Sequence, residues 1–567
     1  MYIMGIWDGH DAGAAIIKDN KILVAVNEER LSGRKLDAGF PVLSIKECLR
    51  YLNLRPEDIN CISSCTTDFS KTLTRAFPSL KEQYYLIRRR KVKQGAFESL
   101  KKKAKYMLTE IGPSAASRYI SRHLITRELK DIGFKKTDFH QYSHHDCHAA
   151  AAAFCCGYDK SLVVTLDGIG DGLSGGISLM DDNRLSLIKT IHGRDSFGIF
   201  FEHVTNLLNM RELEDEGKVM ALADYAYPID DKKNPLLDFF EINGLSVNAK
   251  YGSLKMYGQL KRILWMYPSE QFAFMAQRLL EVKVTELVKN ALTITDCTHI
   301  ALAGGVFSNI VVNMLISELP TVSDCFIFPH MGDGGLAVGA AMCANYNLNE
   351  VAKYEFKDVF LGADFNDSDI LTVLKEHNLK FEKKPDIAKA AAELISSGNI
   401  VFWFNGRMEY GPRALGKRSI LALPNSEEIK NRLNLKLKMR VWYQPFCPSI
   451  LKEDFDSLID RNGNSTYNKF MAMGYRVKPE LVPDMKGIVS LRGVCRPQVV
   501  DEHDGLFYNL LLELKNLTGR GVVLNTSFNI HGQPLVCTPA DAVKTLITAG
   551  NKYLAIGSYL VENENAG

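Results

Sequence analysis

The sequence has little net charge, no long apolar run and no pair of cysteines spaced as C-x-x-C. Its 69 Lys and Arg residues nearly balance 66 Asp and Glu residues, for a formal net charge of +3, so charge alone predicts no affinity for nucleic acid or membranes. The twelve cysteines show no disulfide-scaffold pattern and indicate reduced thiols. The first residues, MYIMGIWDGHDAG, lack the basic and apolar regions of a signal peptide. We therefore expect a soluble, cytoplasmic protein.

The length and the hydrophobic content indicate two domains. A chain of 567 residues is too long for one ordinary domain, and a hydrophobic fraction of 46% can supply two cores. The one marked run of basic residues spans 87–105, and we interpret it as a solvated helical face, with contact to an anionic partner as the alternative.

A weak internal repeat suggests how the first part of the chain folds. Residues 2–26 are typical of strand, Asp-Gly loop, strand, turn and strand. Residues 162–191 repeat that order, with Asp167-Gly168 in the place of Asp8-Gly9. Further on, 299–316 and 324–346 each run from an apolar strand through a Gly-rich loop into a helix, and such helix N-termini favour anions. The alternation predicts an α/β domain of two related halves over residues 1–355.

A different pattern begins near residue 356 and predicts a smaller α/β domain over 356–567. It has helices at 386–398 and 539–550 and strands at 399–406 and 521–530. Its segment GPRALGKR (411–418) nearly matches a phosphate-binding P-loop, but Arg418 stands where the Ser or Thr that holds Mg²⁺ belongs, so we reject a P-loop NTPase. The cations Arg413, Lys417 and Arg418 still favour an anion site, with a solvated basic loop as the alternative.

The segment HQYSHHDCHAA (140–150) is a candidate metal site. His144 and His148 are four residues apart, about 40° around a helix, so both imidazoles can face one ion; His145 and His148 are the other usable pair. Asp167 and Asp333 each follow an apolar strand beside glycines and could complete the set. Two histidines and two aspartates suit Fe²⁺, Mn²⁺ or Zn²⁺, whereas the alternative is that these are structural residues at a helix start.

Two further residues stand in loops where a ligand could come close. His10 lies in the first Asp-Gly loop and is a candidate general base for a substrate hydroxyl, or else a hydrogen-bonded loop residue. Lys218, in EGKVMALA (216–223), could touch a phosphate or form a salt bridge.

These motifs together resemble the NodU/CmcH/TobZ family of O-carbamoyltransferases over essentially the whole chain. The matching strings are GHDAGAAI, HHDCHAAAAAF, LDGIGDG, EGKVMALA, AGGVFSN, GDGGLAVGAA, GRMEYGPRALGKRSIL, CRPQVVD, NTSFN and PLVCTPADA. The resemblance implies an N-terminal domain of the actin/Hsp70/sugar-kinase (ASKHA) type over 1–355 and a C-terminal YrdC-like domain over 356–567. It also implies that the C-terminal domain converts carbamoyl phosphate and ATP, the latter with Mg²⁺, into carbamoyl adenylate. The carbamoyl group would then pass to a hydroxyl in the N-terminal domain.

The resemblance also implies a role for particular residues. His10 matches the catalytic histidine of the family, and a divalent metal, most often Fe²⁺, would be held by His144, His148, Asp167 and Asp333. Carbamoyl phosphate or its adenylate would contact Arg413, Lys438, Arg440, Gln444, Arg496 and Ser527. Nucleotide contacts are expected from Gly168, Gly170, Asp171, Gly304, Gly305, Asn309 and Lys218.

One departure from the family pattern concerns the donor substrate. This chain reads QPFCPS where the family usually reads R-P-F-A-P-S, so Gln444 stands in place of an arginine. An amide donates hydrogen bonds without charge. Arg440 could compensate, carbamoyl phosphate could bind more weakly, or the donor could differ.

The acceptor is open, since the family modifies small molecules and sugars, and the insert at 70–125 is a candidate wall of its pocket. No nucleic acid or membrane partner is expected, and a homodimer is one alternative for the assembly. The competing functions are an actin-like ATP-binding protein and a small-molecule kinase without carbamoyl transfer. Neither would need both the histidine-rich segment and the basic C-terminal cluster.

Overall fold

The computed structural model describes residues 1–92, 108–135, 138–350, 353–530, 532–564 and 566. By its internal contacts the chain divides into two units. The first comprises residues 1–28 and 36–356, and the second comprises 29–35 and 357–567. Part of the basic run at 87–105 lies outside the described residues, and so does part of the 70–125 insert.

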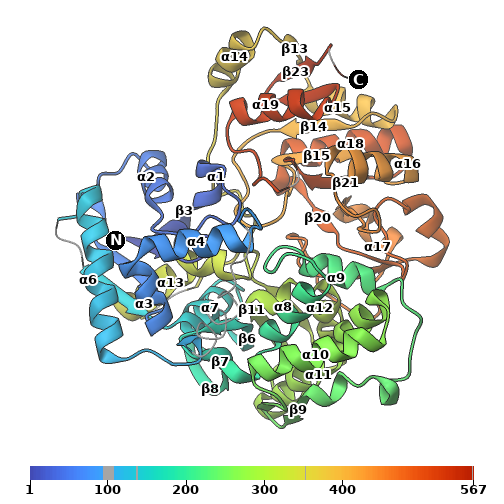
Figure 1. The fold of residues 1–567 in the computed structure, drawn as a ribbon. Coiled ribbons are helices and arrows are strands. Elements are labelled where there is room, and N and C mark those ends of the chain that lie inside the picture. The colour runs from blue at the N-terminus through green and yellow to red at the C-terminus, as the bar shows by residue number, and fades with distance from the viewer. Residues whose placement is uncertain (93–107, 136–137, 351–352, 531, 565, 567) are drawn as a thin grey trace. The chain divides into compact units, whose positions relative to one another are not determined.

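The first unit is built on two five-stranded sheets with one topology. In each sheet a three-stranded antiparallel meander is followed by two parallel strands. The first sheet has the order β3-β2-β1-β4-β5 (Lys21–Asn27, Gly13–Lys18, Tyr2–Trp7, Cys61–Cys65, Asp138–Tyr142). The second has the order β12-β11-β6-β7-β8 (Asp324–Ile327, His299–Ala303, Lys160–Gly170, Leu173–Asp181, Arg184–His192). Figure 1 labels β3 of the first sheet and β6, β7, β8 and β11 of the second. The predicted repeat of two related halves is confirmed, and with it the α/β fold class of the actin/Hsp70/sugar-kinase type.

The helices of the first unit include two whose side chains are small and almost entirely buried. These are α7 (His144–Ala153) and α13 (Leu336–Asn349). They pack so closely that a Cβ on Gly339 would lie 2.1 Å from the carbonyl oxygen of Cys147, which explains the Gly- and Ala-rich sequence of both. A hairpin is formed by β9 (Phe240–Asn243) and β10 (Ser246–Ala249). The other α-helices described in this unit are α2 (Val42–Tyr51), α3 (Phe69–Ala76), α4 (Pro78–Arg88), α6 (Ala115–Ile132), α8 (Phe197–Leu207), α9 (Glu216–Ala223), α10 (Ser253–Met266), α11 (Ser269–Thr295) and α12 (Ile310–Ser317).

The second unit is an α/β domain around a mixed eight-stranded sheet. The strand order is β13-β23-β22-β14-β15-β21-β16-β20 (Lys380–Lys383, Tyr559–Glu562, Tyr553–Ile556, Val401–Phe404, Arg418–Ala422, Val522–Ser527, Cys447–Leu451, Gln498–Val500). Helices α15 (Ile387–Ser396) and α18 (Leu506–Thr518) share one core with this sheet, in which Trp403 is fully buried. The remaining helices are α14, α16, α17 and α19 (Asp367–Glu376, Glu427–Asn431, Lys452–Leu458, Pro539–Ala549), and β17, β18 and β19 (Ile459–Asp460, Tyr475–Val477, Val494–Cys495) form a small sheet.

One short segment departs from the domain limits expected from the sequence. Residues 29–35, which include most of helix α1 (Glu28–Ser32), belong to the second unit although they lie early in the chain. The buried guanidinium of Arg30 donates a hydrogen bond of 2.8 Å to the carbonyl oxygen of Gly411. Leu31 packs against the cluster that contains Met408 and Ala414. These contacts are why the segment 29–35 is part of the second unit.

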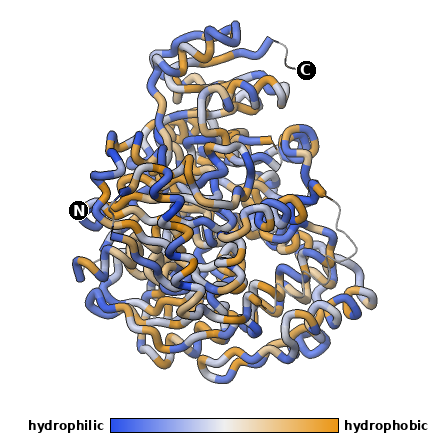
Figure 2. The backbone as a smooth tube through the Cα atoms, turned by 60° about the vertical axis from the view of Figure 1, so that its left-hand side comes forward, coloured by the Kyte–Doolittle hydropathy of each residue, from blue (hydrophilic) through white to orange (hydrophobic). Residues whose placement is uncertain are grey.

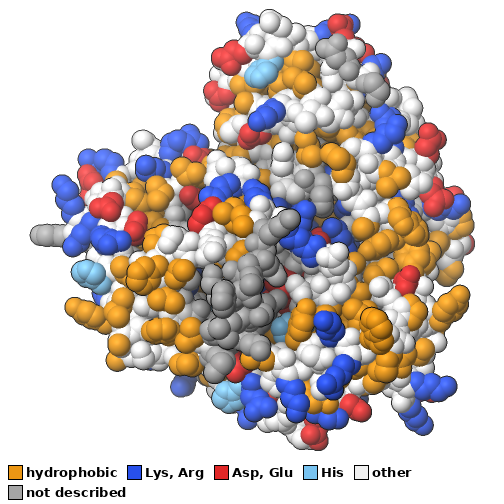
Figure 3. Space-filling model, viewed as in Figure 1, with side chains coloured by type: hydrophobic (Ala, Val, Ile, Leu, Met, Phe, Trp, Pro, Cys, Tyr) orange, Lys and Arg blue, Asp and Glu red, His pale blue; other side chains and the backbone are white. Residues whose placement is uncertain are grey.

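Polar and apolar residues alternate along the chain, and charges of both signs share its surface. Figure 2 shows hydrophobic residues spread along the backbone in short stretches. Within the described residues, no helix combines the length and apolar character needed to cross a lipid bilayer. On the face drawn in Figure 3, basic and acidic side chains are interspersed, as the small net charge predicts.

Candidate active site

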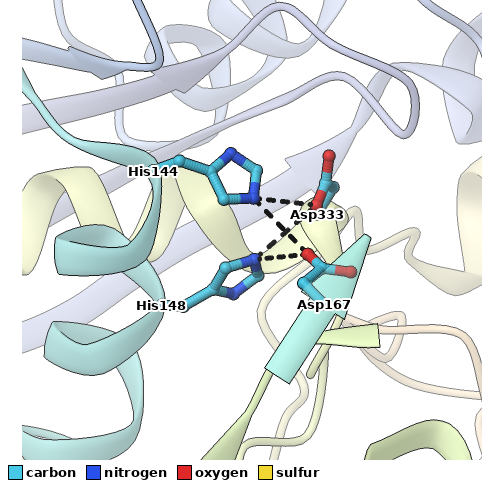
Figure 4. Close-up of side chains that lie close together, drawn as sticks. All are labelled: His144, His148, Asp167 and Asp333. Atoms are coloured by element: carbon cyan, nitrogen blue, oxygen red, sulfur yellow. Dashed lines mark hydrogen bonds and ion pairs between the residues drawn. The ribbon is translucent and has the colours of Figure 1, made fainter. Parts of the chain in front are cut away.

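Two histidines and two aspartates converge in the first unit (Figure 4). His144 and His148 come from successive turns of α7, Asp167 from β6, and Asp333 from the turn before α13. The Nε2 atom of His148 lies 3.0 Å from Oδ2 of Asp167 and 3.6 Å from Oδ1 of Asp333. The Nε2 atom of His144 lies 3.4 Å and 3.5 Å from the same two oxygens. All four ligand atoms are within 4.8 Å of one another.

Local sequence fixes the orientation of His144. Ser143 caps α7, its hydroxyl accepting the N–H of Asp146. The backbone N–H of His144 donates to Oδ2 of Asp171 at 2.8 Å. The Nδ1 atom of its ring lies 2.9 Å from the hydroxyl of Thr66. With Nδ1 engaged in this way, Nε2 is the ring atom that faces the aspartates, as in metal-binding histidines.

A glycine makes room for the same ring. A Cβ on Gly170 would lie 2.2 Å from Cγ of His144. Gly170 ends β6, whose pairing with β7 shifts register between Leu166 and Gly170. The sequence predicted that Asp167-Gly168 ends the strand, but β6 continues to Gly170, so Asp167 lies inside it, in this irregular stretch. Its Oδ1 accepts the N–H groups of Gly168 and Gly305, at 2.8 and 3.1 Å, which leaves Oδ2 to face the histidines.

The electrostatics of the cluster favour a bound cation. Burial by itself lowers the pKa of His144, but the carboxylates of Asp333 and Asp167 raise it well above the ordinary value. Burial and Asp333 push the pKa of Asp167 upward, yet the bonds to His144 and His148 outweigh them and hold it below its usual value. Two buried carboxylates that face two imidazole nitrogens are a donor set suited to a first-row divalent ion. Such an ion would neutralise both carboxylates, so these residues fit a metal.

His10 lies next to this cluster, in the loop between β1 and β2. Its Nε2 atom is 3.2 Å from Oδ2 of Asp333, whose other oxygen faces His144 and His148. Its Nδ1 is 3.5 Å from a carboxylate oxygen of Asp11. Burial lowers the pKa of His10, but Asp333 and Asp11 raise it above the ordinary value. His10 is therefore held beside the metal-type cluster, with Asp333 as the shared partner.

Two other residues expected around this site, His145 and Lys218, are bound to groups of the protein itself. His145 binds Thr165 and the carbonyl of Leu173 through its two ring nitrogens, and burial lowers its pKa to about 3, so it is structural. Lys218 forms a salt bridge of 2.6 Å with Asp215. A salt bridge was one of the two alternatives for this lysine, and contact with a phosphate was the other.

The residues expected at a nucleotide are in part occupied by the protein itself. Asp171 accepts backbone N–H groups from Thr67, Asp68 and His144 with its two oxygens. Asn309 caps α12 and binds Gln277. The glycines at 168, 170, 304 and 305 form the turns around Asp167. A nucleotide role for this set stays a prediction.

In the second unit, Lys438 is buried among oxygen acceptors. Its ammonium contacts the carbonyl and hydroxyl oxygens of Ser527 and both oxygens of Asn529, the side-chain oxygen at 2.6 Å. None of these partners is charged. Burial lowers the pKa of Lys438 well below the ordinary value, and nearby Arg440 adds to that effect.

Near this lysine, Arg413 and Arg440 each lie within electrostatic reach of Arg496. Burial and then Arg496 lower the pKa of Arg413 to about 9. Burial lowers the pKa of Arg440 to about 10, and Arg496 adds to the effect. Arg496 donates from Nε and Nη2 to the sulfur of Cys447, at 3.1 and 3.0 Å. In the described part of the chain, none of the three arginines forms an ion pair with a carboxylate.

Polar atoms in this arginine cluster lack partners. Nε of Arg413, one terminal nitrogen of Arg440 and the side-chain oxygen of Gln444 are buried without a hydrogen bond among the described residues. Since buried polar atoms are nearly always bonded, and the unpaired charge is positive, the cluster suits an anionic ligand. Gln444 adds no charge.

The expected grouping of Arg413 with Lys417 and Arg418 is wrong. Lys417 donates to the carbonyl of Asp504 and lies over the ring of Phe360. Arg418 is fully buried, and its guanidinium donates to the carbonyl oxygens of Asn405 and Gly406, directly after β14. Both side chains are therefore engaged by main-chain oxygens of the second unit, and neither is left over for the cluster of Arg413.

Sequence reasoning missed the partners that position the site. Thr66 holds His144 from a loop 78 residues earlier, and the carboxylate of Asp11 lies 3.5 Å from Nδ1 of His10 without a hydrogen bond. The carboxylate of Asp8 pairs with Lys71 and Arg75 of α3, and its main-chain oxygen contacts Lys81 of α4. The only local indication of the contact between Thr66 and His144 is the short polar string TTD at 66–68, directly after a buried strand.

Comparison with known proteins gives consistent results along the chain. Residues 2–342 match the family model described as Carbamoyltransferase N-terminus, and residues 392–563 match that described as Carbamoyltransferase C-terminus. The sequence is 30% identical over 580 residues to Uncharacterized protein MJ1051 of Methanocaldococcus jannaschii, which covers 99% of both chains. It is 29% identical over 570 residues to Nodulation protein NolNO of Sinorhizobium fredii, covering 98% of this chain and 79% of that one. The crystal structure of full-length HypF in the phosphate- and nucleotide-bound form is similar with a TM-score of 0.38 at 13% identity, over 62% of this chain and 47% of that one.

Proposed function

Because the chain belongs to the carbamoyltransferase family, we propose that it activates carbamoyl phosphate with ATP in its second unit and transfers the carbamoyl group to a hydroxyl in its first. The protein is a carbamoyltransferase enzyme. The observation that carries the proposed division is the presence of two separate clusters of opposite character. One is a carboxylate and histidine cluster with His10 beside it, and the other is a cluster of unpaired cations.

The arginine cluster is suited to the first half-reaction. Carbamoyl phosphate carries a dianionic phosphoryl group, and Arg413, Arg440 and Arg496 offer guanidinium forks that bind such oxygens through charge-assisted bonds. Water takes up the phosphoryl group, which gives phosphate and carbamate. The carbamate oxygen then attacks the α-phosphorus of ATP, pyrophosphate leaves with Mg²⁺, and carbamoyl adenylate forms. Ser527 and Lys438, which already contact each other, would hold the leaving oxygens.

The first unit is suited to the second half-reaction. An acceptor hydroxyl beside His10 would give its proton to the imidazole and attack the carbamoyl carbon, and AMP would leave. Asp333 orients His10 through one carboxylate oxygen and raises its pKa, which stabilises the imidazolium that forms. A divalent metal held by His144, His148, Asp167 and Asp333 would supply Lewis-acid polarisation. We propose Fe²⁺, with Mn²⁺ and Zn²⁺ suited to the same donors.

Gln444 does not by itself deprive the site of a cation. Arg440 lies over the ring of Phe446 with its guanidinium carbon 4.2 Å from the centroid, and its Nε is fixed by Asn434. It retains one unpartnered nitrogen. We propose that Arg440 binds the phosphate in place of the arginine that the family usually has at position 444.

A small-molecule kinase is the competing function, and one assay separates the two. The full chain is incubated with ATP, Mg²⁺ and carbamoyl phosphate without any acceptor. The adenylate route releases phosphate and pyrophosphate and, after breakdown of the adenylate, AMP. Formation of ADP without pyrophosphate would refute the proposal and favour a kinase. A hydroxylated acceptor should then yield a product heavier by one carbamoyl group.

A further inference from the structure

Three cationic side chains surround one buried carboxylate at the end of β1. Asp8 is 5% exposed, and Arg75 binds it with two hydrogen bonds, from Nε at 2.7 Å and from Nη2 at 2.9 Å. The ammonium of Lys71 lies 2.9 Å from Oδ1 of the same carboxylate. The ammonium of Lys81 contacts the main-chain oxygen of Asp8. Lys71 and Arg75 come from α3, and Lys81 comes from α4.

The charges in this group do not balance. Arg75 is saturated, because it also donates to Thr66, Cys65 and Ser121. Asp8 can neutralise one of the three cations. Among the described residues, Lys81 forms no ion pair with any carboxylate. Burial lowers its pKa to about 7, and the nearby charge of Lys71 adds to that effect. A buried ammonium that meets one carbonyl oxygen has donors to spare, because it carries three N–H groups.

The group is tied to the proposed general base by a rigid loop. The indole of Trp7 donates to the carbonyl oxygen of His10 at 2.7 Å, and Lys71 lies over that indole at 4.2 Å. A Cβ on Gly9 would lie 1.9 Å from the same ring. The loop that carries Asp8 and His10 is therefore clamped on Trp7, so the cations and His10 keep a fixed spacing.

Helix α4 carries a second cation, Arg88, whose charge is neutralised by carboxylates. Arg88 lies two turns after Lys81 on α4 and is close enough to lower the pKa of His10. Its guanidinium is paired with Glu202 at 2.8 Å, with Glu212 at 3.7 Å. Lys81 has no such partner in the described protein, although it lies at the same helix face, since residues seven apart share a face.

We propose that the acceptor is an anionic hydroxy compound, whose phosphate or carboxylate group binds Lys81 while its hydroxyl reaches His10. This inference rests on the proposed function and names the class of its acceptor. A cationic acceptor, such as an amino sugar, would meet like charge at this point, and a neutral sugar would leave the ammonium unpaired. An anion would complete the pairing of the three cations.

Matched acceptors test the proposal on the metal-loaded full chain. The enzyme is given ATP and radiolabelled carbamoyl phosphate with glucose, glucose 6-phosphate, glucuronate or glucosamine, and with glycerol, glycerol 3-phosphate or glycerate. We expect an anionic acceptor to be preferred in each series. Comparison of the phosphate and carboxylate compounds then shows which of the two anionic groups is recognised. Lys81→Met should lower kcat/KM for that acceptor by about 10- to 100-fold, the loss typical of a charge-assisted bond, and leave the neutral analogue unchanged.

Two control variants make the test specific. Lys81→Arg keeps the charge and should restore part of the activity, whereas Lys46→Met, at an exposed lysine of α2, should change nothing. Preference for a neutral or cationic acceptor would overturn the inference, as would equal losses with charged and neutral acceptors in Lys81→Met. Equal losses would mean that Lys81 has a structural role only, which is to attach α4 to the loop that carries Asp8.

A binding measurement keeps the inference testable when no acceptor reacts. Equilibrium dialysis with radiolabelled inorganic phosphate should show that Lys81→Met loses one class of sites and Arg413→Met loses another. If Lys81→Met binds as much phosphate as the unchanged protein, the inference is wrong. Failure of the proposed function would appear elsewhere, as the absence of pyrophosphate release from ATP and carbamoyl phosphate.

Discussion

Replacing Arg413 with methionine should make the protein more stable and less active at once. The side chain lies in a cluster of like charges, where burial and Arg496 lower its pKa from the ordinary value of an arginine to about 9. Methionine has nearly the same length and no charge, so it removes the repulsion and the unpartnered Nε. A residue that stabilised the fold would give the opposite change in stability.

The size of the effect follows from the pKa. The lowering of the pKa to about 9 corresponds to an upper limit of about 5 kcal/mol, at 1.36 kcal/mol for each pH unit. Because the side chain is only half-buried, solvent screening reduces this, and we expect a gain of about 1–3 kcal/mol in the free energy of unfolding at pH 7.5. The sign follows from proton binding. Between pH 9 and the ordinary pKa of an arginine, the folded state holds fewer protons on Arg413 than the unfolded state, so the full cost is present below pH 9.

Urea denaturation of the full chain, with and without phosphate, measures both sides of this prediction. Phosphate should stabilise the unchanged protein, by about 2.7 kcal/mol at one hundred times its dissociation constant, and should stabilise Arg413→Met much less. Pyrophosphate release dependent on carbamoyl phosphate should fall more than about 100-fold, because a charged group that binds the donor is gone. Arg432→Met, at an exposed arginine of the same unit, should alter neither property.

The outcome that would refute the reasoning is a less stable Arg413→Met that still responds fully to phosphate. Arg413 would then be a structural residue, and the anion site would have to be sought elsewhere. Loss of metal from the first unit in this variant would contradict the assignment of the two clusters to separate tasks.

Three further predictions concern the first unit. Asp167→Asn should reduce the bound metal, measured by mass spectrometry, while pyrophosphate release continues; retained metal would remove Asp167 from the ligands. Thr66→Val should weaken metal binding by about 10- to 100-fold, because the hydroxyl that orients His144 is lost; an unchanged affinity would make that bond incidental. Burial raises the pKa of Glu216 from 4.5 to about 8, so the folded state holds the extra proton in that range and stability falls as pH rises. Glu216→Gln keeps the bond from the N–H of Leu213 and should be equally stable at pH 4.5. At pH 8 the pKa sets an upper limit of about 4 kcal/mol, and because the side chain is partly exposed we expect a gain of about 2 kcal/mol; a constant difference across this range in urea denaturation would contradict the prediction.

Much of the architecture was predictable because its determinants are local. The two hairpin repeats carry their strand and turn patterns within thirty residues, and the pair His144 and His148 follows from helical spacing alone. Asp167 and Asp333 were identifiable because each comes at the end of an apolar run beside glycines. The extent of β6 was not, since an irregular strand that continues through Asp167-Gly168 has the same residues as a loop.

What could not be predicted depends on contacts between distant parts of the chain. In the sequence, Lys417 and Arg418 look like part of one basic group with Arg413, but each donates to main-chain oxygens from other segments. The three cations at Asp8 come from segments more than sixty residues later. Sequence shows that charged residues are present; only the fold shows which of them remain unpaired.

The early segment 29–35 limits how this protein could be divided. Since it belongs to the second unit while its flanks belong to the first, the polypeptide changes unit three times rather than once. If the chain were split after Phe356, the C-terminal fragment would lack Arg30, which donates to the carbonyl oxygen of Gly411, and Leu31, which packs against the cluster of Met408 and Ala414. A single break between the two units would therefore remove contacts that the second unit needs from the early part of the chain.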